Sequence, residues 1–384
     1  MRLLFVCPSL GYGGAETQLI ALAKGLGARG HEVVIYSMSG QSERPHQLEE
    51  HGVKVIHDEK RSRLDFSLIG RMRAFVSAWQ PEVVHGFLFD GNLYARLAAV
   101  ANGGAVCLSA ERSSDYSLRR AQTIGHHLTK HITRAVVANS YAGAEFARRL
   151  FAFPPERVHV VWNGIDLCAV RQRASLATGL RASLGMDHGD KLLCFVGSIK
   201  PEKDYVLALK IVRELLLIEA GKWHCLFIGA GYAKSMPYTV QEFDQSQAYA
   251  AVVEGLFSDL PSLARVHRFG AVDNVIELMA QSDVLLSTSI REGFPNVVLE
   301  AMASGLPVVS TEYSDIRRIL PLPWQVVAER NVASLVSALE RASGAEAKAV
   351  KLAQEVWVDQ HASIEQAVLS LEAVYRACLL EAGK

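Results

Sequence analysis

The sequence VLLSTSIREGFPNVVLEAMASGLPVVS, residues 284–310, decides the fold class. It begins with an apolar run, Val284–Thr288, and continues through a loop that contains Pro295 into a short helical pattern, Asn296–Ala303. Proline suits the first position of a helix, and glycine, here Gly305, suits the residue after its end. A second apolar run closes the stretch. Strand, loop, helix and strand in this order predict a βαβ unit with two parallel strands.

The same alternation runs along almost the whole chain. Strands are expected at residues 3–7, 32–36, 53–56, 82–85, 105–109, 135–139, 158–162, 192–196, 224–228 and 266–269, and at 308–310 beyond the helix of the opening stretch. Helices are expected at residues 16–26, 66–79, 92–101, 205–220 and 275–280, and throughout the tail, 333–381. The strand pattern pauses at the polar, Ala-rich segment 171–185 and then restarts. At roughly 100–200 residues per domain, 384 residues predict an α/β protein of two doubly wound domains.

Composition excludes several classes of function. Lys+Arg and Asp+Glu number 40 each, so the zero net charge does not favour a nucleic-acid-binding protein. The sequence contains no run of 18 apolar residues, so no membrane-spanning helix is predicted. The six cysteines are scattered, without the spacing of metal ligands.

In doubly wound sheets, ligands bind outside the carboxyl ends of the strands, so the strand-to-helix loops carry the candidate site residues. The first loop contains Gly13 and Gly14, which would let the backbone approach an anion. The loop does not match a dinucleotide fingerprint, because the position that requires its last glycine is occupied by Glu16. In addition, no acidic residue ends the strand 32–36. An NAD-dependent oxidoreductase is therefore nearly excluded.

Two polar residues lie at the end of the predicted strand 82–85 and in the loop after it. His85 and Asp90, at a strand end, are candidate catalytic residues. The alternative for His85 is a structural role, and the alternative for Asp90 is capping of the following helix.

The second domain offers a basic loop after its first strand. Gly197, Ser198, Lys200 and Lys203 lie there, and a lysine at a strand end suits a phosphate group. Gly229, in the sequence Gly229–Gly231, marks another place where the backbone can approach a ligand.

Two glutamates lie in the opening stretch, Glu292 in its loop and Glu300 in its helix. The backbone N–H groups of residues 296–298 would be free to bind a diphosphate at the helix start. Carboxylates next to a diphosphate make sense if they accept hydrogen bonds from hydroxyl groups. Glu292 would accept them from a sugar, and Glu300 would accept them from a ribose.

The segment Glu292–Ala303, followed by Gly305–Val309, resembles the paired-glutamate motif of the retaining glycosyltransferases of family 4. Further similarities follow in family order: Gly13–Glu16, Gly30–Val33, Asn163–Asp166 and Pro201–Lys203. The resemblance covers essentially the whole chain.

This resemblance implies the GT-B fold, with two Rossmann-like domains facing across a cleft. Residues 1–165 would form the acceptor-side domain, residues 166–359 would bind the nucleotide sugar, and a final helix within 360–384 would pack back on the first domain. The implied donor is a UDP-sugar or GDP-sugar, with no metal ion and no other cofactor.

The resemblance also implies roles for individual residues. Lys203 would neutralise the donor diphosphate, Glu292 would hold the sugar and Glu300 the ribose. The implied donor-binding residues are Gly13, Gly14, Gly197, Ser198, Lys200, Lys203, Gly229, Glu292, Gly293, Phe294, Pro295, Asn296, Val297 and Glu300. Two positions depart from the family: Ser198 stands where an arginine is usual, and Phe87 stands where the family has a second histidine after His85.

The predicted reaction is transfer of a hexose or N-acetylhexosamine to a saccharide acceptor in surface polysaccharide or glycoconjugate synthesis. The stretch 119–134 carries basic residues between apolar ones and favours contact with an anionic membrane, hence a lipid-linked acceptor at the cytoplasmic face. A solvated helix face is the alternative for this stretch. For the whole chain, a nucleotide-sugar epimerase and a non-catalytic, degenerate transferase stay open.

Overall fold

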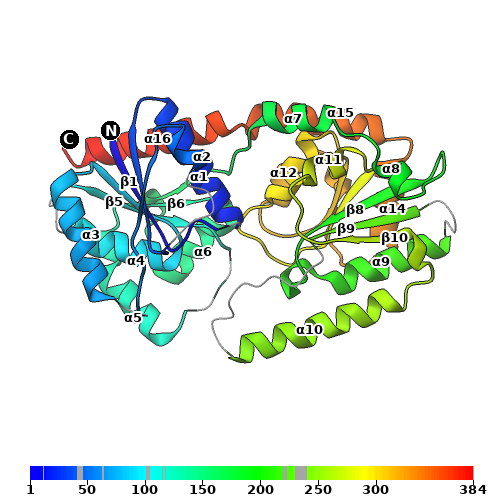
Figure 1. Ribbon diagram of the computed structural model, residues 1–384, viewed down its shortest axis with the longest axis horizontal. Helices are drawn as coiled ribbons and strands as arrows, with labels where there is room; N and C mark the ends of the chain where they lie inside the picture. Colours follow the sequence, from blue (N-terminus) through cyan, green and yellow to red (C-terminus); the bar gives the residue numbers. More distant parts are fainter. Residues whose placement is uncertain are drawn as a thin grey trace. The chain divides into compact units, whose positions relative to one another are not determined.

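The computed structural model describes residues 1–11, 13–40, 46–62, 65–100, 104–114, 116, 118–218, 223–229 and 240–383. The chain forms two compact units, which are described one at a time (Figure 1). Unit 1 is Met1–Gly164 with Ala362–Lys384, and unit 2 is Ile165–His361. The sequence predicts a boundary at 165–166, and the units divide between residues 164 and 165.

Unit 1 contains a seven-stranded parallel sheet in the order β3-β2-β1-β4-β5-β6-β7. Its strands are β1 Arg2–Cys7, β2 Glu32–Ser37, β3 Lys54–His57, β4 Val83–Gly86, β5 Val106–Glu111, β6 Ala135–Ala138 and β7 Val158–Val160. Its helices are α1 Gly14–Ala28, α2 His46–Glu49, α3 Phe66–Trp79, α4 Leu88–Ala99, α5 Arg120–Thr129, α6 Tyr141–Phe151 and α16 Ile364–Glu381, with 3-10 turns Lys130–Ile132 and Pro155–Arg157.

The strands of unit 1 are apolar on both sides, as expected for a sheet covered by helices on both faces. Successive residues of β1 point to opposite faces. Leu3 and Phe5 belong to a core with α1 and α16, whereas Leu4 and Val6 belong to a second core with α3 and α4. This two-sided burial is the physical reason that the strands read as continuous apolar runs.

The last helix of the chain belongs to unit 1. Figure 1 shows α16, in red, beside α1, in blue, and the two helices are in contact. Leu371 and Tyr375 of α16 are fully buried in the core, and Glu372 bonds Arg29, which follows α1, at 2.6 Å. The neighbouring arginines lower the pKa of Glu372 to about 2. Residues separated by more than 300 positions thus complete one hydrophobic core.

Unit 2 contains a six-stranded parallel sheet in the order β10-β9-β8-β11-β12-β13. Its strands are β8 Lys191–Val196, β9 Trp223–Ile228, β10 Val266–Phe269, β11 Val284–Ser287, β12 Val308–Thr311 and β13 Val326–Val327. Its helices are α7 Leu167–Ser175, α8 Leu180–Ser183, α9 Tyr205–Ile218, α10 Val240–Ser258, α11 Val275–Ala280, α12 Asn296–Ala303, α13 Ile316–Ile319, α14 Val332–Ser343 and α15 Ala347–His361, with 3-10 turns η3 Pro201–Lys203, Leu263–Arg265 and Pro323–Gln325. Residues of β8, β9, α9, α10 and α14 share one core, while α7 packs on α11 and α12, and α15 packs on α12.

The structure confirms two doubly wound sheets and several predicted elements residue by residue, including α3, α11 and α12. The predicted helix 92–101 is wrong at its start, because α4 already begins at Leu88 with a positive φ of 61°. Helices α6 and α10 were not predicted at all. In the described part of α10, Val253 and Phe257 are fully buried, so its apolar stripe is too narrow to show clearly in the sequence.

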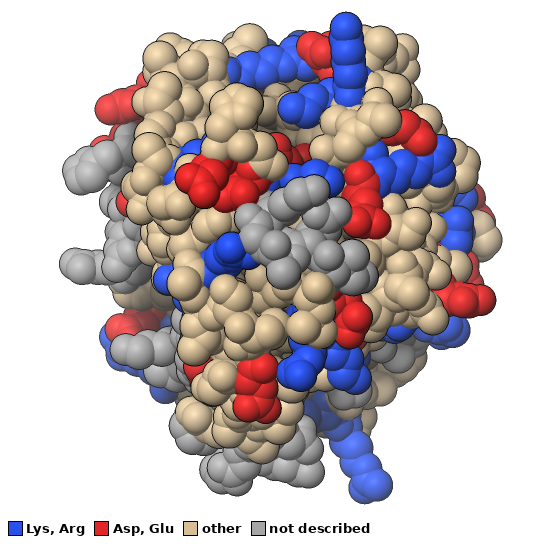
Figure 2. All heavy atoms as spheres, turned by 90° about the vertical axis from the view of Figure 1, so that its right-hand side faces the viewer, with Lys and Arg blue, Asp and Glu red and all other residues tan. Residues whose placement is uncertain are grey.

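In the described part of the chain, no helix combines the length and apolar character needed to span a membrane. Figure 2 shows one face of the molecule, on which Lys and Arg side chains are interspersed with Asp and Glu. On the coloured part of that face, no broad surface of a single charge sign is visible. This agrees with the balanced charge count of the sequence.

Candidate active site

The topology of unit 2 brings two predicted loops together. Strands β8 and β11 are neighbours in the sheet, but the chain continues from β8 to β9 on one side and from β11 to β12 on the other. Ligands bind at such a switch point, where the loops after two neighbouring strands diverge. A small pocket lies there, lined by Phe195, Val196, Lys203, Leu285, Leu286, Ser287, Thr288, Ser289, Glu292, Pro295, Val297, Val298 and Tyr313.

Lys203 and Glu292, predicted from separate loops, form an ion pair in this pocket. Lys203 Nζ lies 2.8 Å from Glu292 Oε1, across 89 residues of sequence. The side chains are 23% and 17% exposed, so both remain reachable for a ligand. Ser289 Oγ also donates to Glu292 Oε1. The pair places one positive and one negative group side by side at the carboxyl ends of β8 and β11.

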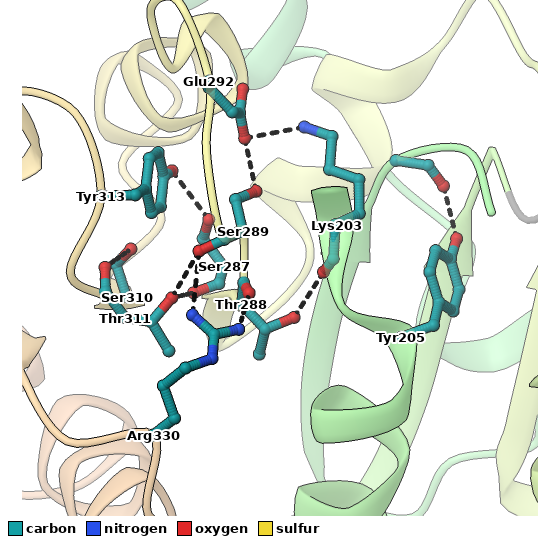
Figure 3. Close-up of polar contacts among 11 residues, drawn as sticks. Lys203, Tyr205, Ser287, Thr288, Ser289, Glu292, Ser310, Thr311, Tyr313 and Arg330 are labelled. Carbon is teal, nitrogen blue, oxygen red and sulfur yellow. Dashed lines mark hydrogen bonds and ion pairs between the residues drawn. The ribbon is translucent and has the colours of Figure 1, made fainter. Parts of the chain in front are cut away.

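A guanidinium group, that of Arg330, joins the two loops, and Figure 3 shows its bonds on the β11 side. Arg330, from the loop before α14, donates to the Asp204 carboxylate at 2.6 Å. It also donates to the carbonyl oxygens of Thr288, at 2.5 Å, and Ser289, at 3.2 Å. Arg330 therefore ties the residue after Lys203 to the two residues that follow β11.

Hydroxyl groups complete this network beneath the ion pair. Thr288 Oγ1 donates to the Lys203 carbonyl at 2.7 Å, and Thr311 Oγ1 donates to the Ser289 carbonyl at 2.9 Å. The hydroxyl groups of Tyr313 and Ser287 are 2.9 Å apart, and burial raises the pKa of Tyr313. These bonds fix the backbone on both sides of the pocket, so the charged groups are supported by a rigid second layer.

The basic loop after β8 lies beside the pocket. Gly197 donates its N–H to the Ile228 carbonyl, and a Cβ at Gly197 would come within 3.2 Å of the Lys203 side chain. Gly229 has a φ of +79°, which favours glycine, and its N–H donates to the Phe269 carbonyl at 3.0 Å. The predicted residues Ser198 and Lys200 lie on the same loop as Gly197, and residues 230–231 fall outside the described residues.

The start of α12 differs from the sequence prediction. Pro295 precedes the helix as its N-cap residue instead of occupying the first helical position. The Asn296 N–H donates to the Phe294 carbonyl, and the Val298 N–H donates to the Pro295 carbonyl, each at 3.0 Å. The prediction that all three amides of residues 296–298 are free is therefore wrong, because the tight turn uses two of them. The Gly293 carbonyl accepts a bond from Ser314 Oγ at 3.2 Å, which anchors the same turn.

Glu300, on α12, occupies a distinct environment. Burial raises the pKa of its carboxyl to about 7, although the Arg173 charge partly opposes the shift. Arg173 makes a bidentate pair with Glu277, with both bonds at 2.8 Å, so its charge is already compensated. Glu300 thus lies near a cation that is committed to another carboxylate.

Unit 1 has its own switch point, between β1 and β4. The β1 loop leads into α1, with Gly13 as N-cap residue and Gly14 as first helical residue. A Cβ at Gly13 would lie 2.1 Å from Glu16 Oε2, so this turn packs closely. Asp90 lies in the first turn of α4, where Lys60 pairs with it at 2.6 Å. The cap expected from Asp90 is absent, since Phe87 is the N-cap residue and its side chain makes no capping bond.

The burial of His85 contradicts a catalytic role. Its side chain is fully buried, and its Nδ1 lies 2.6 Å from the Tyr375 hydroxyl on α16. Burial and the nearby Arg112 charge hold the pKa of His85 well below its ordinary value, so the ring stays neutral. Phe87 is also buried and packs on His85 with ring centroids 4.5 Å apart. The prediction of a catalytic His85 is therefore wrong, because this side chain cannot touch a substrate without unpacking the core.

The basic stretch 119–134 divides between the interior and the surface. His126 is buried, with its Nδ1 3.0 Å from Arg96, and Arg134 pairs with Glu381 of α16 at 2.7 Å. The predicted basic stripe is therefore wrong for His126, which is buried, whereas Arg134 remains partly exposed and ion-paired. Arg119, Arg120, His127 and His131 are exposed, and so are Ile124, at 60%, and Leu128, at 69%.

Sequence reasoning missed several residues of the site. Arg330 gave no signal, because it lies 126 residues from its partner Asp204 and belongs to no recognised motif. Thr288 and Ser289 could have been found, since hydroxyl side chains directly after a strand lie at the ligand-binding edge of a sheet.

Two family models match the chain. The model described as Glycosyltransferase Family 4 matches residues 12–168, and the model described as Glycosyl transferases group 1 matches residues 178–355.

Several named proteins are similar in sequence. A D-inositol 3-phosphate glycosyltransferase of Rhodococcus erythropolis is 30% identical over 196 residues, which are 50% of this chain and 41% of that protein. One of Segniliparus rotundus is 25% identical, covering 97% of this chain and 81% of that protein. An N-acetyl-alpha-D-glucosaminyl L-malate synthase of Bacillus anthracis is 29% identical, covering 44% and 39%. The chain thus spans less than half the length of the Rhodococcus and Bacillus proteins.

Solved structures show the fold. A glycosyltransferase from Rickettsia africae has a TM-score of 0.81 at 16% identity, covering 98% of both chains. The Anabaena protein HepE in complex with UDP has a TM-score of 0.82 at 16% identity, covering 98% of this chain and 100% of that one. These likenesses confirm the predicted GT-B fold class of two Rossmann-like domains.

Proposed function

Because the chain belongs to glycosyltransferase family 4, we propose that it transfers a hexose or N-acetylhexosamine from a nucleoside diphosphate sugar to a saccharide acceptor. The proposed reaction retains the anomeric configuration and needs no metal ion or additional cofactor. The proposed donor carries UDP or GDP. In support, the Anabaena protein HepE, which has a similar fold, was solved in complex with UDP-glucose.

The ion pair of Lys203 and Glu292 carries this proposal. On donor binding, the Lys203 ammonium would exchange its carboxylate partner for the diphosphate and stabilise the leaving group as its charge develops. Glu292 would then accept hydrogen bonds from the sugar hydroxyls. The bonds from Arg330 and Thr288 hold both loops at this spacing, so little reorganisation is required.

The other polar groups of the site take supporting roles in this proposal. Glu300 accepts bonds from the ribose hydroxyls, and the glycine loops at Gly197 and Gly229 admit the diphosphate. In unit 1, the loop of Gly13 and Gly14 faces the transferred sugar and the acceptor. Asp90 remains a candidate base, although its bond to Lys60 must be released first.

The proposed acceptor is linked to a lipid, and the enzyme acts at the cytoplasmic face of a membrane. The exposed side of α5 supports this proposal. Ile124 and Leu128, one turn apart, are exposed between the basic residues Arg120 and His131. An apolar stripe with basic flanks suits a surface of anionic lipid.

Calorimetry with UDP, GDP and their sugars, in the presence of a metal chelator, tests the donor site. We expect binding of one nucleotide in about the micromolar range, weakened roughly tenfold or more in Glu300→Ala, since the hydrogen bonds between its carboxyl and the ribose hydroxyls are lost. Glu355→Ala, an exposed glutamate on α15, is the matched control and should bind like the wild type. The configuration of the product sugar, measured by NMR, tests retention.

Each outcome selects among the functions. Absence of nucleotide binding would overturn the donor site. Binding without transfer to any acceptor would favour the degenerate, non-catalytic transferase, whereas interconversion of nucleotide sugars without an acceptor would favour the epimerase.

A further inference from the structure

Arg112 is a second cation at a ligand-binding edge, in unit 1. It directly follows β5, which pairs with the switch-point strand β4. Its Nη1 donates to Asn163 Oδ1 at 3.0 Å, and its guanidinium lies over the Phe87 ring, 5.2 Å from the ring centroid. The side chain is thus held in one orientation at the carboxyl end of the sheet.

Within the described residues, the charge of Arg112 is only partly compensated, because Glu111 acts on it electrostatically but forms no ion pair with it. Its Nε is buried without a hydrogen-bond partner there, and no carboxylate of these residues forms an ion pair with it. The adjacent Glu111 carboxylate points elsewhere, accepting bonds from the backbone N–H groups of residues 112 and 113 and from the Tyr116 hydroxyl. Burial lowers the pKa of Arg112 to about 10, which shows the cost of keeping this group charged.

A buried arginine of the same unit makes a useful contrast. Arg96 is 2% exposed and also lacks a carboxylate partner among the described residues, but its guanidinium bonds Ser109, Thr133 and His126. Arg96 is therefore satisfied by neutral acceptors of the protein. Arg112, in contrast, has one side-chain acceptor and is partly exposed, so that a ligand can reach it.

A desolvated cation with an unpaired N–H donor, such as the Nε of Arg112, is costly unless a ligand supplies an acceptor. The planar fork of a guanidinium matches the oxygens of a phosphate. Its place beside the β4 loop, at the carboxyl ends of parallel strands, is where ligands of such sheets bind. We propose that Arg112 binds a phosphate group of a substrate in unit 1, with Asn163 orienting the guanidinium. The identity of the phosphate-bearing molecule, acceptor or donor, rests on the proposed function.

Calorimetric titration of the full chain with inorganic phosphate tests the site. We expect the wild type to bind phosphate and Arg112→Gln to bind it on the order of tenfold more weakly, because a charge-assisted bond is lost. Arg112→Lys should retain part of the affinity, since it keeps the charge without the fork. Equal affinity in the wild type and Arg112→Gln, or no binding by the wild type, would overturn the proposal.

Two controls separate this site from others. Arg73→Gln removes one charge from α3 of the same unit, where Arg73 bonds a backbone carbonyl, and should leave phosphate binding unchanged. Lys203→Met removes the cation of the unit 2 pocket. If phosphate binding survives in Lys203→Met but falls in Arg112→Gln, the binding belongs to Arg112. Melting temperatures of all variants establish that they are folded. If Arg112→Gln is unfolded, the phosphate affinity of Arg112→Lys is compared with that of the wild type instead.

Saturating UDP distinguishes the two sources of phosphate. If the Arg112-dependent binding persists with UDP bound, the phosphate belongs to the acceptor; if UDP displaces it, the phosphate belongs to the donor. UDP binding by the wild type tests the proposed function separately. UDP binding together with phosphate binding that ignores Arg112 would leave the function standing and refute this inference.

Discussion

At the scale of single residues, the carboxyl of Glu300 shows how burial sets chemistry. Arg173, the cation that acts on it among the described residues, is engaged by Glu277, so desolvation dominates and raises the pKa to about 7. Near neutral pH the carboxyl is therefore partly protonated in the folded chain. Its ordinary value is 4.5, so the folded state binds more protons than the unfolded state between these two values.

This difference predicts a pH-dependent stability. The favourable contribution of the protonated Glu300 is present below its ordinary pKa and is lost as the pH rises through about 7. The variant Glu300→Gln should match the wild type at low pH and be more stable at pH 8, by on the order of 2 kcal/mol. Urea unfolding at a series of pH values measures the difference. Glu355→Gln, on exposed α15, should show no such trend, and parallel curves for Glu300→Gln would contradict the assignment.

At the scale of elements, α5 is the clearest case of a helix with an unusual outer face. Its inner side is held by the buried His126 and Thr129, while Ile124 and Leu128 face solvent. Exposed apolar side chains one turn apart are unfavourable in water, and their burial in a lipid interface is favourable.

We expect the full chain to float with vesicles that contain anionic phosphatidylglycerol and not with neutral phosphatidylcholine vesicles. The double variant Ile124→Ser and Leu128→Ser should reduce the bound fraction on the order of tenfold, since burial of each side chain is lost. Phe66→Ser, at a 74% exposed position of α3, is the control and should bind as the wild type does. Unchanged flotation of the double variant would exclude α5 as the contact.

At the scale of the whole molecule, the chain returns to its first unit at its end. Helix α16 supplies Val368, Leu371 and Tyr375 to the core that β1 and α1 begin. The core of unit 1 therefore includes residues of α16, although most of its residues come first in the sequence.

Leu371→Ala should destabilise the chain by about 2–5 kcal/mol, the cost of a cavity at a fully buried leucine. Leu369→Ala, two residues away on the same helix but 48% exposed, should change stability by much less. Urea unfolding compares the two variants. Similar losses in both would mean that α16 does not complete the core as described.

Much of the fold was readable from the sequence because its signals are local. Apolar runs and helical periods predicted most strands and the helices α3, α9, α11 and α12, since burial on both sheet faces leaves a continuous pattern. Helix α10 escaped because few of its residues form an apolar stripe, whereas α6 is amphipathic and could have been predicted from its period. The motif of residues 292–303 identified the family, and it offered its charged residues Glu292 and Glu300 as candidate donor contacts, which stay predictions.

Tertiary structure decided what each polar group faces. The pairing of Lys203 with Glu292 and the bonds of Arg330 to Asp204 join residues 89 and 126 positions apart. The order of strands in the sheet, which no local period encodes, brings them together. The same holds for His85, whose position at a strand end suggested catalysis until α16 covered it with Tyr375. The sequence by itself determined most of the elements, the fold class and the family, because periodicity and motif are properties of neighbouring residues. Burial and charge compensation, which decide reactivity, arise only when distant segments pack.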